Sequence, residues 1–279
     1  MPVIRVFAPA KINLSLHVIG RRKDGYHLLD SLVVFASVGD EITAKPAPTL
    51  TFGVEGAKAG GIPMDESNLV LQAAALFPDP KGAVLMLTKE LPASAGIGGG
   101  SSDAAATLQA LSRLWHADLP SASDILKLGA DVPVCLKAEA TRMRGVGGHL
   151  TRVPPLPPMF AVLVNPGVPV QTPAVFAALS NPSNIPMPDQ FPRFDNNVDF
   201  AKWLATQRND LEAPASMVAP VIPTVLSELW GCNGCLLARM SGSGATCFGL
   251  FTTPEAAERA ASLLRDENPD WWVVDTRLS

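Results

Sequence analysis

The chain has 279 residues, 47% of them hydrophobic, which is enough for one large domain or two domains of ordinary size. Its net charge of −4, from 22 basic and 26 acidic residues, argues against nucleic acid or an anionic membrane as the main partner. Its apolar runs are shorter than the roughly 18 to 20 residues of a membrane span. No signal segment precedes the first strand-like run, so we expect a cytoplasmic globular protein.

Four cysteines are spread along the chain, and two of them, Cys232 and Cys235, have the Cys-X-X-Cys spacing of metal and redox sites. No second pair and no histidine cluster accompanies them in the sequence. The pattern therefore favours reduced, structural thiols.

Residues 12–18 alternate strictly between apolar and polar side chains, which predicts a half-buried strand. By the period of two, Lys11 and Asn13 fall on the polar face, so both can point at one ligand. A solvated lysine at a strand edge fits this local pattern as well.

A basic turn at residues 20–27 follows and is closed by Asp24-Gly25, a hairpin signal that leads into a strand-like run at 32–38. Tyr26 is the only tyrosine, and it stands beside His27. An aromatic ring next to an imidazole on a loop suits stacking on a planar base and recognition of its edge. Packing of the ring under the turn is the alternative.

Capping residues at 65–68 predict a helix from about residue 69 to 77, and residues 83–87 predict a strand. Residues 91–106 then read as strand end, glycine loop and helix, with four glycines in the five positions from 96 to 100. Such a loop can wrap a ligand, and the free amides and dipole of the following helix favour a phosphate. A glycine-rich turn of purely structural role remains the alternative.

Two named phosphate motifs are excluded for this loop. A P-loop needs Gly-Lys-Ser/Thr at its end, whereas these glycines run into Ser101-Ser102-Asp103. The dinucleotide fingerprint needs a third glycine where Ser101 stands, and it belongs in a first βαβ unit. The loop is a phosphate cradle of another kind.

A short helix is predicted over residues 121–128 and is ended by Gly129. Because Pro133 disfavours helical geometry at Val132, we expect residues 130–134 to be extended. Asp131 would then lie between helix and strand, where its carboxylate can face a cleft. A turn or capping aspartate is the alternative.

Four prolines at 151–158 suggest a linker, so we predict an N-terminal domain at 1–150 and a C-terminal domain at 151–279. The second half reads as alternating helices and strands, with a Pro/Asn-rich insert at 181–197 that we expect to be a mobile loop. Strands are predicted at 160–164, on both sides of the small-residue loop 240–245, and at 271–278, and helices at 198–206, 216–229 and 254–265.

Five motifs occur in one order: P-A-K-I-N-L at 9–14, D-G-Y-H at 24–27, G-I-G-G-G-S-S-D-A-A at 96–105, G-A-D-V-P at 129–133 and M-S-G-S-G-A at 240–245. This order resembles the 4-diphosphocytidyl-2-C-methyl-D-erythritol kinases of the GHMP kinase superfamily. The glycine loop and the Ser-Gly-Ser-Gly loop point to the superfamily, and the Gly-Tyr-His and Gly-Ala-Asp-Val-Pro segments point to this member.

The resemblance implies a two-domain α+β GHMP kinase fold, with a left-handed βαβ unit in the N-terminal ATP-binding domain and a ferredoxin-like C-terminal domain. It implies ATP-dependent phosphorylation of the 2-hydroxyl of 4-diphosphocytidyl-2-C-methyl-D-erythritol, in the non-mevalonate route to isoprenoid precursors. The expected cofactors are ATP and Mg²⁺. The expected partner is this small molecule, bound by a monomer or weak homodimer.

By the same resemblance, Asp131 is the catalytic base and Lys11 its partner, which keeps the carboxylate ionised and the hydroxyl oriented. Asn68 and Lys89 would line the adenosine end. Ser101 or Ser102 would lie near Mg²⁺, with no protein residue assigned as a metal ligand. The ATP phosphates would be held by Pro92, Ala93, Ser94, Ala95, Gly96, Ile97, Gly98, Gly99, Gly100, Ser101 and Ser102.

For the acceptor, the resemblance places Asn13 at the methylerythritol part, His27 at the cytosine edge, and Tyr26 and Phe176 on opposite faces of the base. The insert at 181–197 departs from the family pattern and could cover the substrate mouth. Homoserine or mevalonate kinase is disfavoured, because Tyr26 and His27 have no task without a nucleobase. A catalytically inactive binding module on the same fold has no need of Lys11 together with Asp131.

Overall fold

The computed structural model describes residues 3–79 and 81–279, and these form two compact units whose segments alternate along the chain. The long strands β1 (Ile4–Arg21) and β2 (His27–Pro46) contribute residues to both units. The first unit contains the residues up to Lys11, Val38–Ala93 and Gly98–Ala138, and the second contains Ile12–Ser37, Ser94–Ile97 and Glu139–Ser279. The domain ranges 1–150 and 151–279 stay a prediction.

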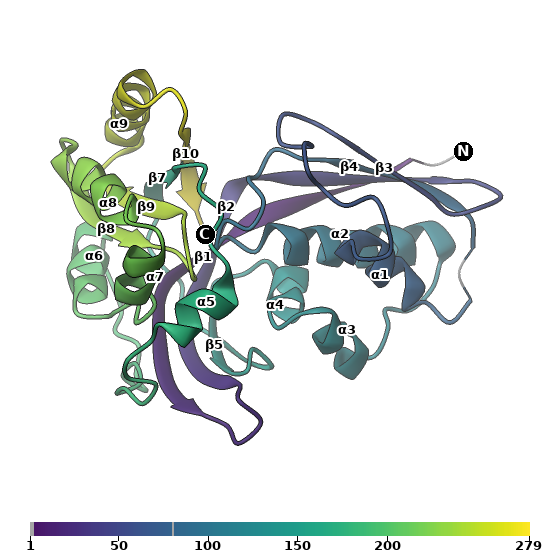
Figure 1. The fold of residues 1–279 in the computed structure, drawn as a ribbon, viewed down its shortest axis with the longest axis horizontal. Helices are drawn as coiled ribbons and strands as arrows, with labels where there is room; N and C mark the ends of the chain where they lie inside the picture. The colour runs from purple at the N-terminus through teal and green to yellow at the C-terminus, as the bar shows by residue number, and fades with distance from the viewer. Residues whose placement is uncertain (1–2, 80) are drawn as a thin grey trace. The chain divides into compact units, whose positions relative to one another are not determined.

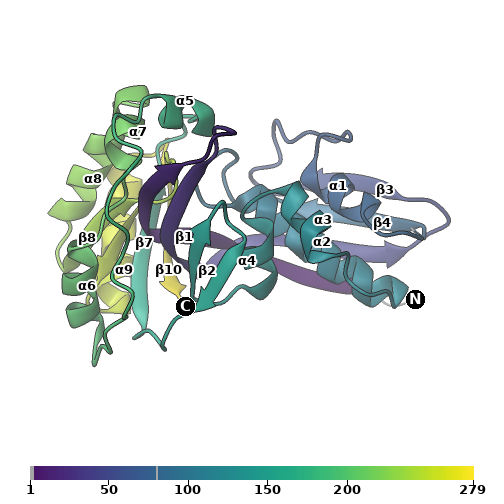
Figure 2. The ribbon, with the colours of Figure 1, turned by 90° about the horizontal axis from the view of Figure 1, so that it is seen from below.

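In the first unit, helices cover one face of a sheet (Figures 1 and 2). The second half of β2 pairs antiparallel with β4 (Ala83–Thr88), and β4 pairs parallel with β3 (Thr51–Glu55). The helices are α1 (Leu69–Ala75), α2 (Gly99–Trp115), α3 (Ala122–Leu128) and α4 (Val132–Lys137). The long helix α2 packs against α1 and α4, so the end of the glycine loop is fixed by a buried helix.

The expectation of an extended segment at 130–134 is wrong, because α4 begins at Val132. Pro133 lies in the first turn of this helix, where its missing N–H would have no intrahelical acceptor and its ring has no preceding turn to clash with. Asp131 therefore stands at the N-terminal end of a helix instead of in a helix-to-strand gap.

The second unit contains an antiparallel sheet in the order β10-β7-β9-β8, against which α8 and α9 pack (Figure 1). The first half of β2 pairs with β5 (Thr141–Gly145), which pairs with β6 (His149–Arg152). The remaining strands are β7 (Met159–Asn165), β8 (Cys235–Met240), β9 (Cys247–Phe251) and β10 (Trp272–Leu278). The helices are α5 (Thr172–Ala177), α6 (Asn197–Ala205), α7 (Glu212–Val218), α8 (Ile222–Gly231) and α9 (Pro254–Glu267).

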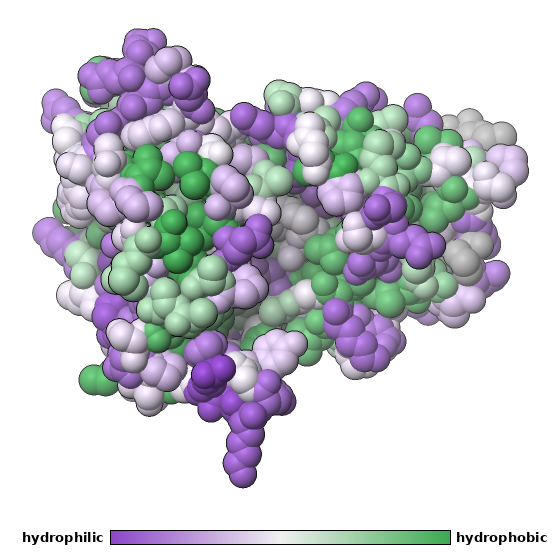
Figure 3. Space-filling view, viewed as in Figure 1, coloured by the Kyte–Doolittle hydropathy of each residue, from purple (hydrophilic) through white to green (hydrophobic). Residues whose placement is uncertain are grey.

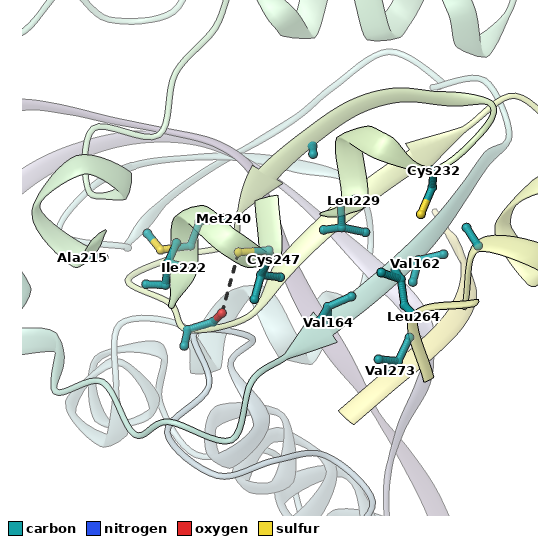
Figure 4. Close-up of a cluster of buried hydrophobic side chains, with 14 of the residues drawn as sticks. Val162, Val164, Ala215, Ile222, Leu229, Cys232, Met240, Cys247, Leu264 and Val273 are labelled. Carbon is teal, nitrogen blue, oxygen red and sulfur yellow. Dashed lines mark hydrogen bonds between the residues drawn. The ribbon is translucent and has the colours of Figure 1, made fainter. Parts of the chain in front are cut away.

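The core of the second unit lies between this sheet and its helices (Figure 4). Val162 and Val164 on β7 meet Leu229 on α8 in one buried cluster, and burial of each such side chain contributes roughly 1.5–3 kcal/mol. Cys232 and Cys247 belong to the same cluster, and all four cysteines are free. The thiols are thus packing residues, as the sequence predicts.

The predicted helix at 216–229 is two helices, α7 and α8. Pro220 lies between them, and a proline inside a helix removes an amide donor and clashes with the preceding turn. Sequence patterns did not predict β3, β5, β6 or α5. Within the described residues no helix is long and apolar enough to cross a membrane.

The turn between β1 and β2 is confirmed as a basic hairpin, and it forms a hydrophilic tip at the bottom of the view in Figure 3. The amide of Arg22 donates to the carbonyl of Tyr26 at 2.7 Å, and Arg22 pairs with Asp24 at 2.6 Å. The turn fixes how β1 and β2 align, and with them Tyr26 and His27.

The expectation of a half-buried strand at 12–18 is wrong, because the polar face of β1 is as buried as the apolar face. Asn13, Ser15 and His17 are all at most 1% exposed. Part of the insert covers this face: the hydroxyl of Ser15 donates to the sulfur of Met187 at 3.0 Å, and Nδ1 of His17 donates to a carbonyl of the insert at 3.0 Å.

Candidate active site

Lys11 and Asp131 form an ion pair in the first unit. The ammonium of Lys11 donates to Oδ2 of Asp131 at 2.5 Å. The Lys11 side chain is 4% exposed, whereas that of Asp131 is 28% exposed. The lysine is therefore fixed within the protein, and the carboxylate keeps an accessible side.

The positions of Lys11 and Asp131 are set by the strand and the helix that carry them. Lys11 lies on β1, and Asp131 is the residue directly before α4, where its carboxylate caps no backbone amide of that helix. The carboxylate is thus left to Lys11 and to whatever approaches its exposed side. A solvated lysine and a capping aspartate both disagree with this geometry, whereas Asp131 does lie in a turn, as the other alternative for this residue expects.

The glycine loop ends at an uncapped helix. Gly98 precedes α2 with a φ of 63°, in the left-handed region that glycine adopts without strain, and it has no side chain to cap the helix. The amides of Gly99, Gly100 and Ser101 donate to no described residue. Together with the helix dipole, these amides make the start of α2 a site for an anion.

The start of α2 is anchored beside the ion pair. A Cβ on Gly98 would lie 3.1 Å from Cβ of Lys11, so the loop crosses directly over the lysine stem. The hydroxyl of Ser102 donates to the carbonyl of Pro9 at 2.6 Å. If Gly129 carried a Cβ, that atom would lie 3.7 Å from the hydroxyl oxygen of Ser101, so the two residues are neighbours. The free amides and the carboxylate therefore belong to one small region of the first unit.

The preceding part of the loop is held in the second unit by the small-residue loop 240–245. The hydroxyl of Ser241 donates to the carbonyl of Gly96 at 3.1 Å, and the amide of Thr246 donates to the carbonyl of Ala95 at 3.1 Å. A Cβ on Gly96 would lie 2.6 Å from the carbonyl oxygen of Ser241, so only glycine fits there. Ala95 and Ile97 are buried, so their backbone alone can face a ligand.

Lys89 lies in a buried ion-pair network. Its ammonium donates to Asp103 at 2.9 Å and to Asp40, and all three residues are at most 3% exposed. The other oxygen of Asp40 accepts from the amides of Glu90 and Leu91, at 2.7 and 2.9 Å. The network joins the segment before the glycine loop to the first turns of α2.

The charged groups in this network shift one another's pKa values. Burial raises the pKa of Asp103 to about 7, although the attraction of Lys89 opposes the shift. Burial lowers the pKa of Lys89, but the two carboxylates outweigh it and leave that pKa raised. A Cβ on Gly99 would lie 3.1 Å from the Lys89 ammonium. Lys89 thus supports the loop backbone from within, and its contact with adenosine stays a prediction.

Asn68 caps helix α1. Its Oδ1 accepts from the amide of Val70 at 2.9 Å, and its Nδ2 donates to the carbonyl of Pro63 at 2.7 Å. A Cβ added to Gly100 would lie 3.5 Å from Cδ1 of the adjacent Leu69, so this end of α1 is close to the glycine loop. The position agrees with a residue near the nucleotide, although its side chain is used in the cap.

In the second unit, His27 and Phe176 stack with ring centroids 4.6 Å apart and an interplanar angle of 14°. Two rings at this spacing leave no room for a third ring between them, so a base would bind on an outer face or separate them. Burial, followed by the charge of Arg21, lowers the pKa of His27. Its imidazole is then neutral near pH 7, with one nitrogen as donor and the other as acceptor.

Tyr26 stands apart from this pair. It is 67% exposed and stacks on no described aromatic ring. The structure therefore brings Phe176 together with His27, and not with Tyr26. The ring of Tyr26 is free to contact a ligand, which disagrees with the alternative that it packs under the turn.

Asn13 has an unused acceptor. Its Nδ2 donates to the hydroxyl of Ser31 at 2.7 Å, and its backbone amide donates to the hydroxyl of Ser241 at 3.1 Å. Its Oδ1 is buried and has no hydrogen-bond partner among the described residues. An oxygen in this state is suited to a ligand that brings a donor.

A protein-held metal site is not assigned. Within residues 3–79 and 81–279, no group of three or more His, Cys, Asp or Glu side chains is placed to hold a metal ion. The hydroxyl proton of Ser102 is donated to Pro9, and Asp131 is paired with Lys11. The oxygen lone pairs of Ser102 stay available in this arrangement, and the placement of Ser101 or Ser102 near Mg²⁺ stays a prediction.

Comparisons with known proteins identify relatives along the whole chain. Residues 68–150 match the GHMP kinases N terminal domain, and residues 195–270 match the GHMP kinases C terminal family. A 4-diphosphocytidyl-2-C-methyl-D-erythritol kinase of Dinoroseobacter shibae is 58% identical, over 98% of this chain and 94% of the relative. One of Cereibacter sphaeroides is 56% identical, over 98% of each.

Solved structures agree with these relatives. A crystal structure of a 4-(cytidine 5'-diphospho)-2C-methyl-D-erythritol kinase has a TM-score of 0.78 at 35% identity and covers 99% of both chains. A mevalonate kinase structure, at 13% identity and a TM-score of 0.61, shares the fold. The mixed α+β fold is thus that of the GHMP kinases. The left-handed βαβ unit and the ferredoxin-like topology stay predictions.

Proposed function

The chain belongs to the 4-diphosphocytidyl-2-C-methyl-D-erythritol kinases of the GHMP kinase superfamily, and from this membership we propose its reaction. It transfers a phosphoryl group from ATP to the 2-hydroxyl of 4-diphosphocytidyl-2-C-methyl-D-erythritol, on the non-mevalonate route to isoprenoid precursors. It works in the cytoplasm, as a monomer or weak homodimer.

One observation carries the proposal: the Lys11–Asp131 pair lies directly beside the free amides that begin α2. Phosphoryl transfer depends mainly on positioning and on charge stabilisation, with a carboxylate that accepts the proton of the acceptor hydroxyl. Asp131 supplies the accessible carboxylate. Lys11 holds this carboxylate in place and brings a positive charge next to it. A binding module has no use for this pair.

The donor site is proposed from the glycine loop. The amides of Gly99, Gly100 and Ser101 are free to donate to phosphate oxygens, and the buried Lys89, which is paired with Asp40 and Asp103, supports the backbone beneath them. ATP supplies the transferable phosphoryl group when bound. Mg²⁺ is proposed to bind together with the nucleotide phosphates, near Ser101 or Ser102.

The acceptor site is proposed from the second unit. Tyr26 offers an exposed ring to the cytosine, and His27 offers one donor and one acceptor to its edge. Phe176 supports His27 by stacking on its ring. Asn13 offers the free Oδ1 to a hydroxyl of the methylerythritol part.

An ADP-release assay tests the proposed reaction, with the cytidyl-methylerythritol substrate beside homoserine and mevalonate. Turnover with the cytidyl substrate, and little with the other two, is the expected result. Preference for homoserine or mevalonate would move the chain to another member of the superfamily. No turnover with all three would favour the inactive binding module.

The Tyr26→Ala variant is expected to raise KM for the cytidyl substrate about tenfold or more, because stacking of a base on an aromatic ring contributes ~1–3 kcal/mol. KM for ATP should change far less. Steady-state kinetics with each substrate varied in turn measure both values. Trp230→Ala, an exposed aromatic residue on α8, is the matched control. Equal weakening of both substrates in Tyr26→Ala would contradict the stacking role.

A further inference from the structure

Arg142 on β5 forms a buried ion pair that the proposed reaction does not use. Its Nε donates to Oδ1 of Asp30 at 2.8 Å, and its Nη2 donates to Oδ2 at 2.6 Å. The two residues are 4% and 0% exposed. Such a bidentate pair is geometrically specific, and removal of one partner leaves a buried charge without compensation.

The same guanidinium also binds the insert. Its Nη2 donates to the carbonyl of Met187 and its Nη1 to the carbonyl of Pro188, both at 2.8 Å. The amide of Met187 donates to Oδ2 of Asp30 at 2.9 Å, and the ring of Phe191 lies 5.7 Å from the guanidinium carbon. Arg142 and Asp30 therefore hold both polar groups of the Met187 backbone.

We call residues 184–189 the strap. Its other end is fixed to β1: the amide of Asn184 donates to the carbonyl of Val18 at 3.0 Å, and the carbonyl of Ile185 accepts from Arg208 at 2.8 Å. The expectation of a mobile loop is thus wrong for this part of the insert. The amide and carbonyl of Met187 are bonded to the buried Asp30 and Arg142, and Met187 is 1% exposed.

The strap connects Arg142 to the acceptor residue Asn13. The sulfur of Met187 accepts from the hydroxyl of Ser15 at 3.0 Å, and the carbonyl of Ser15 accepts from the hydroxyl of Ser31 at 2.6 Å. Ser31 has one hydroxyl proton, and this bond uses it. Ser31 can therefore only accept from Asn13, which turns the NH₂ group toward Ser31 and leaves Oδ1 free.

These contacts end at Oδ1 of Asn13, the oxygen that is free to bind a ligand. A buried amide oxygen without a donor is unfavourable, so the protein holds it there against a local energetic penalty. Asp30 and Ser31 are neighbours on β2, so a shift of the ion pair moves the hydroxyl that orients Asn13. The strap also covers the polar face of β1, which keeps these bonds away from water.

We propose that Arg142 is a positioning residue for the acceptor substrate: it closes the strap over β1, and the closed strap orients Asn13 so that Oδ1 accepts from a substrate hydroxyl. The inference rests on the proposed function, because that function assigns Asn13 to the acceptor. It adds that acceptor binding depends on a residue that touches neither substrate.

The test is the Arg142→Gln variant, with Arg144→Gln as its matched control. Arg144 lies on the same strand and also faces the strap, 3.8 Å from Asp189, but its side chain is 43% exposed. In Arg142→Gln, amide exchange in the strap should be faster by about tenfold or more. KM for the cytidyl substrate should rise about tenfold, the value of roughly one hydrogen bond. KM for ATP should stay unchanged, and Arg144→Gln should match the wild type.

The outcomes separate the two proposals. Wild-type protein without turnover of the cytidyl substrate overturns the proposed function, and the substrate role of Arg142 falls with it. Wild-type turnover together with an unchanged cytidyl KM in Arg142→Gln overturns the positioning role alone. Unchanged strap exchange overturns the closure. If Arg142→Gln does not fold, the double variant Asp30→Asn with Arg142→Gln removes both buried charges, and the same changes are expected of it.

Discussion

The Asp131→Asn variant is expected to lose about 10²-fold or more in kcat, because an amide cannot accept the proton of the acceptor hydroxyl. The substitution is nearly isosteric, and Asp131 caps no helix amide, so the fold of α4 should survive. Affinity for ATP should persist, since the phosphates are proposed to bind at the glycine loop. Single-turnover rates and nucleotide titration measure the two quantities separately.

Asp124→Asn is the control for that experiment. Asp124 lies on the neighbouring helix α3, is exposed, and pairs with Lys127 at 2.8 Å in a similar lysine–aspartate contact. The kcat of the Asp124→Asn variant should equal that of the wild type. Near-normal turnover in Asp131→Asn would remove the assignment of the base, whereas loss of ATP binding in that variant would point to a structural fault.

The Lys89→Met variant should lower the free energy of unfolding by about 3–5 kcal/mol, the cost of breaking a buried ion pair from one side. Methionine fills a similar volume, but Asp40 and Asp103 would keep their burial and lose the cation with which both of them pair. The loop above them would lose its support at Gly99. Urea unfolding at neutral pH measures the change in stability.

Lys127→Met is the matched control for stability. Lys127 also pairs with an aspartate, but its side chain is 75% exposed, and exposed pairs of this kind contribute little to stability. If Lys89→Met lowers the free energy of unfolding as little as Lys127→Met does, the network does not hold the loop. A rise in KM for ATP in Lys89→Met would fit the same role for the network.

Local patterns predicted the parts of this molecule that depend on neighbours in sequence. The glycine loop, the start of α2 and the hairpin before His27 each follow from a few adjacent residues, so they were read correctly. The difference at α4 is local as well: Pro133 disfavours a helix before it, but in the first turn of a helix a proline is compatible with helical geometry.

Contacts between distant segments could not be predicted in this way. Asp103 belongs to the quoted glycine motif, yet its pairing with Lys89 requires the folded sheet and helix together. Arg142 and Asp30 stand 112 positions apart, and no periodicity connects them. The buried polar face of β1 likewise depends on the strap, which gave no strand or helix signal. The Lys11–Asp131 pair was expected only through the family resemblance.

The start of α2 has no capping side chain, so a bound anion would stabilise this end of the helix. Helix α1 is capped by its own Asn68, whereas the glycines that begin α2 offer no side-chain acceptor to the first amides. A ligand that binds only the folded chain stabilises it by RT ln(1 + [L]/Kd), about 2.7 kcal/mol at a hundred times Kd. The nucleotide would then be a stabiliser of the enzyme as well as its phosphoryl donor, and the lifetime of the folded protein would follow the supply of that donor.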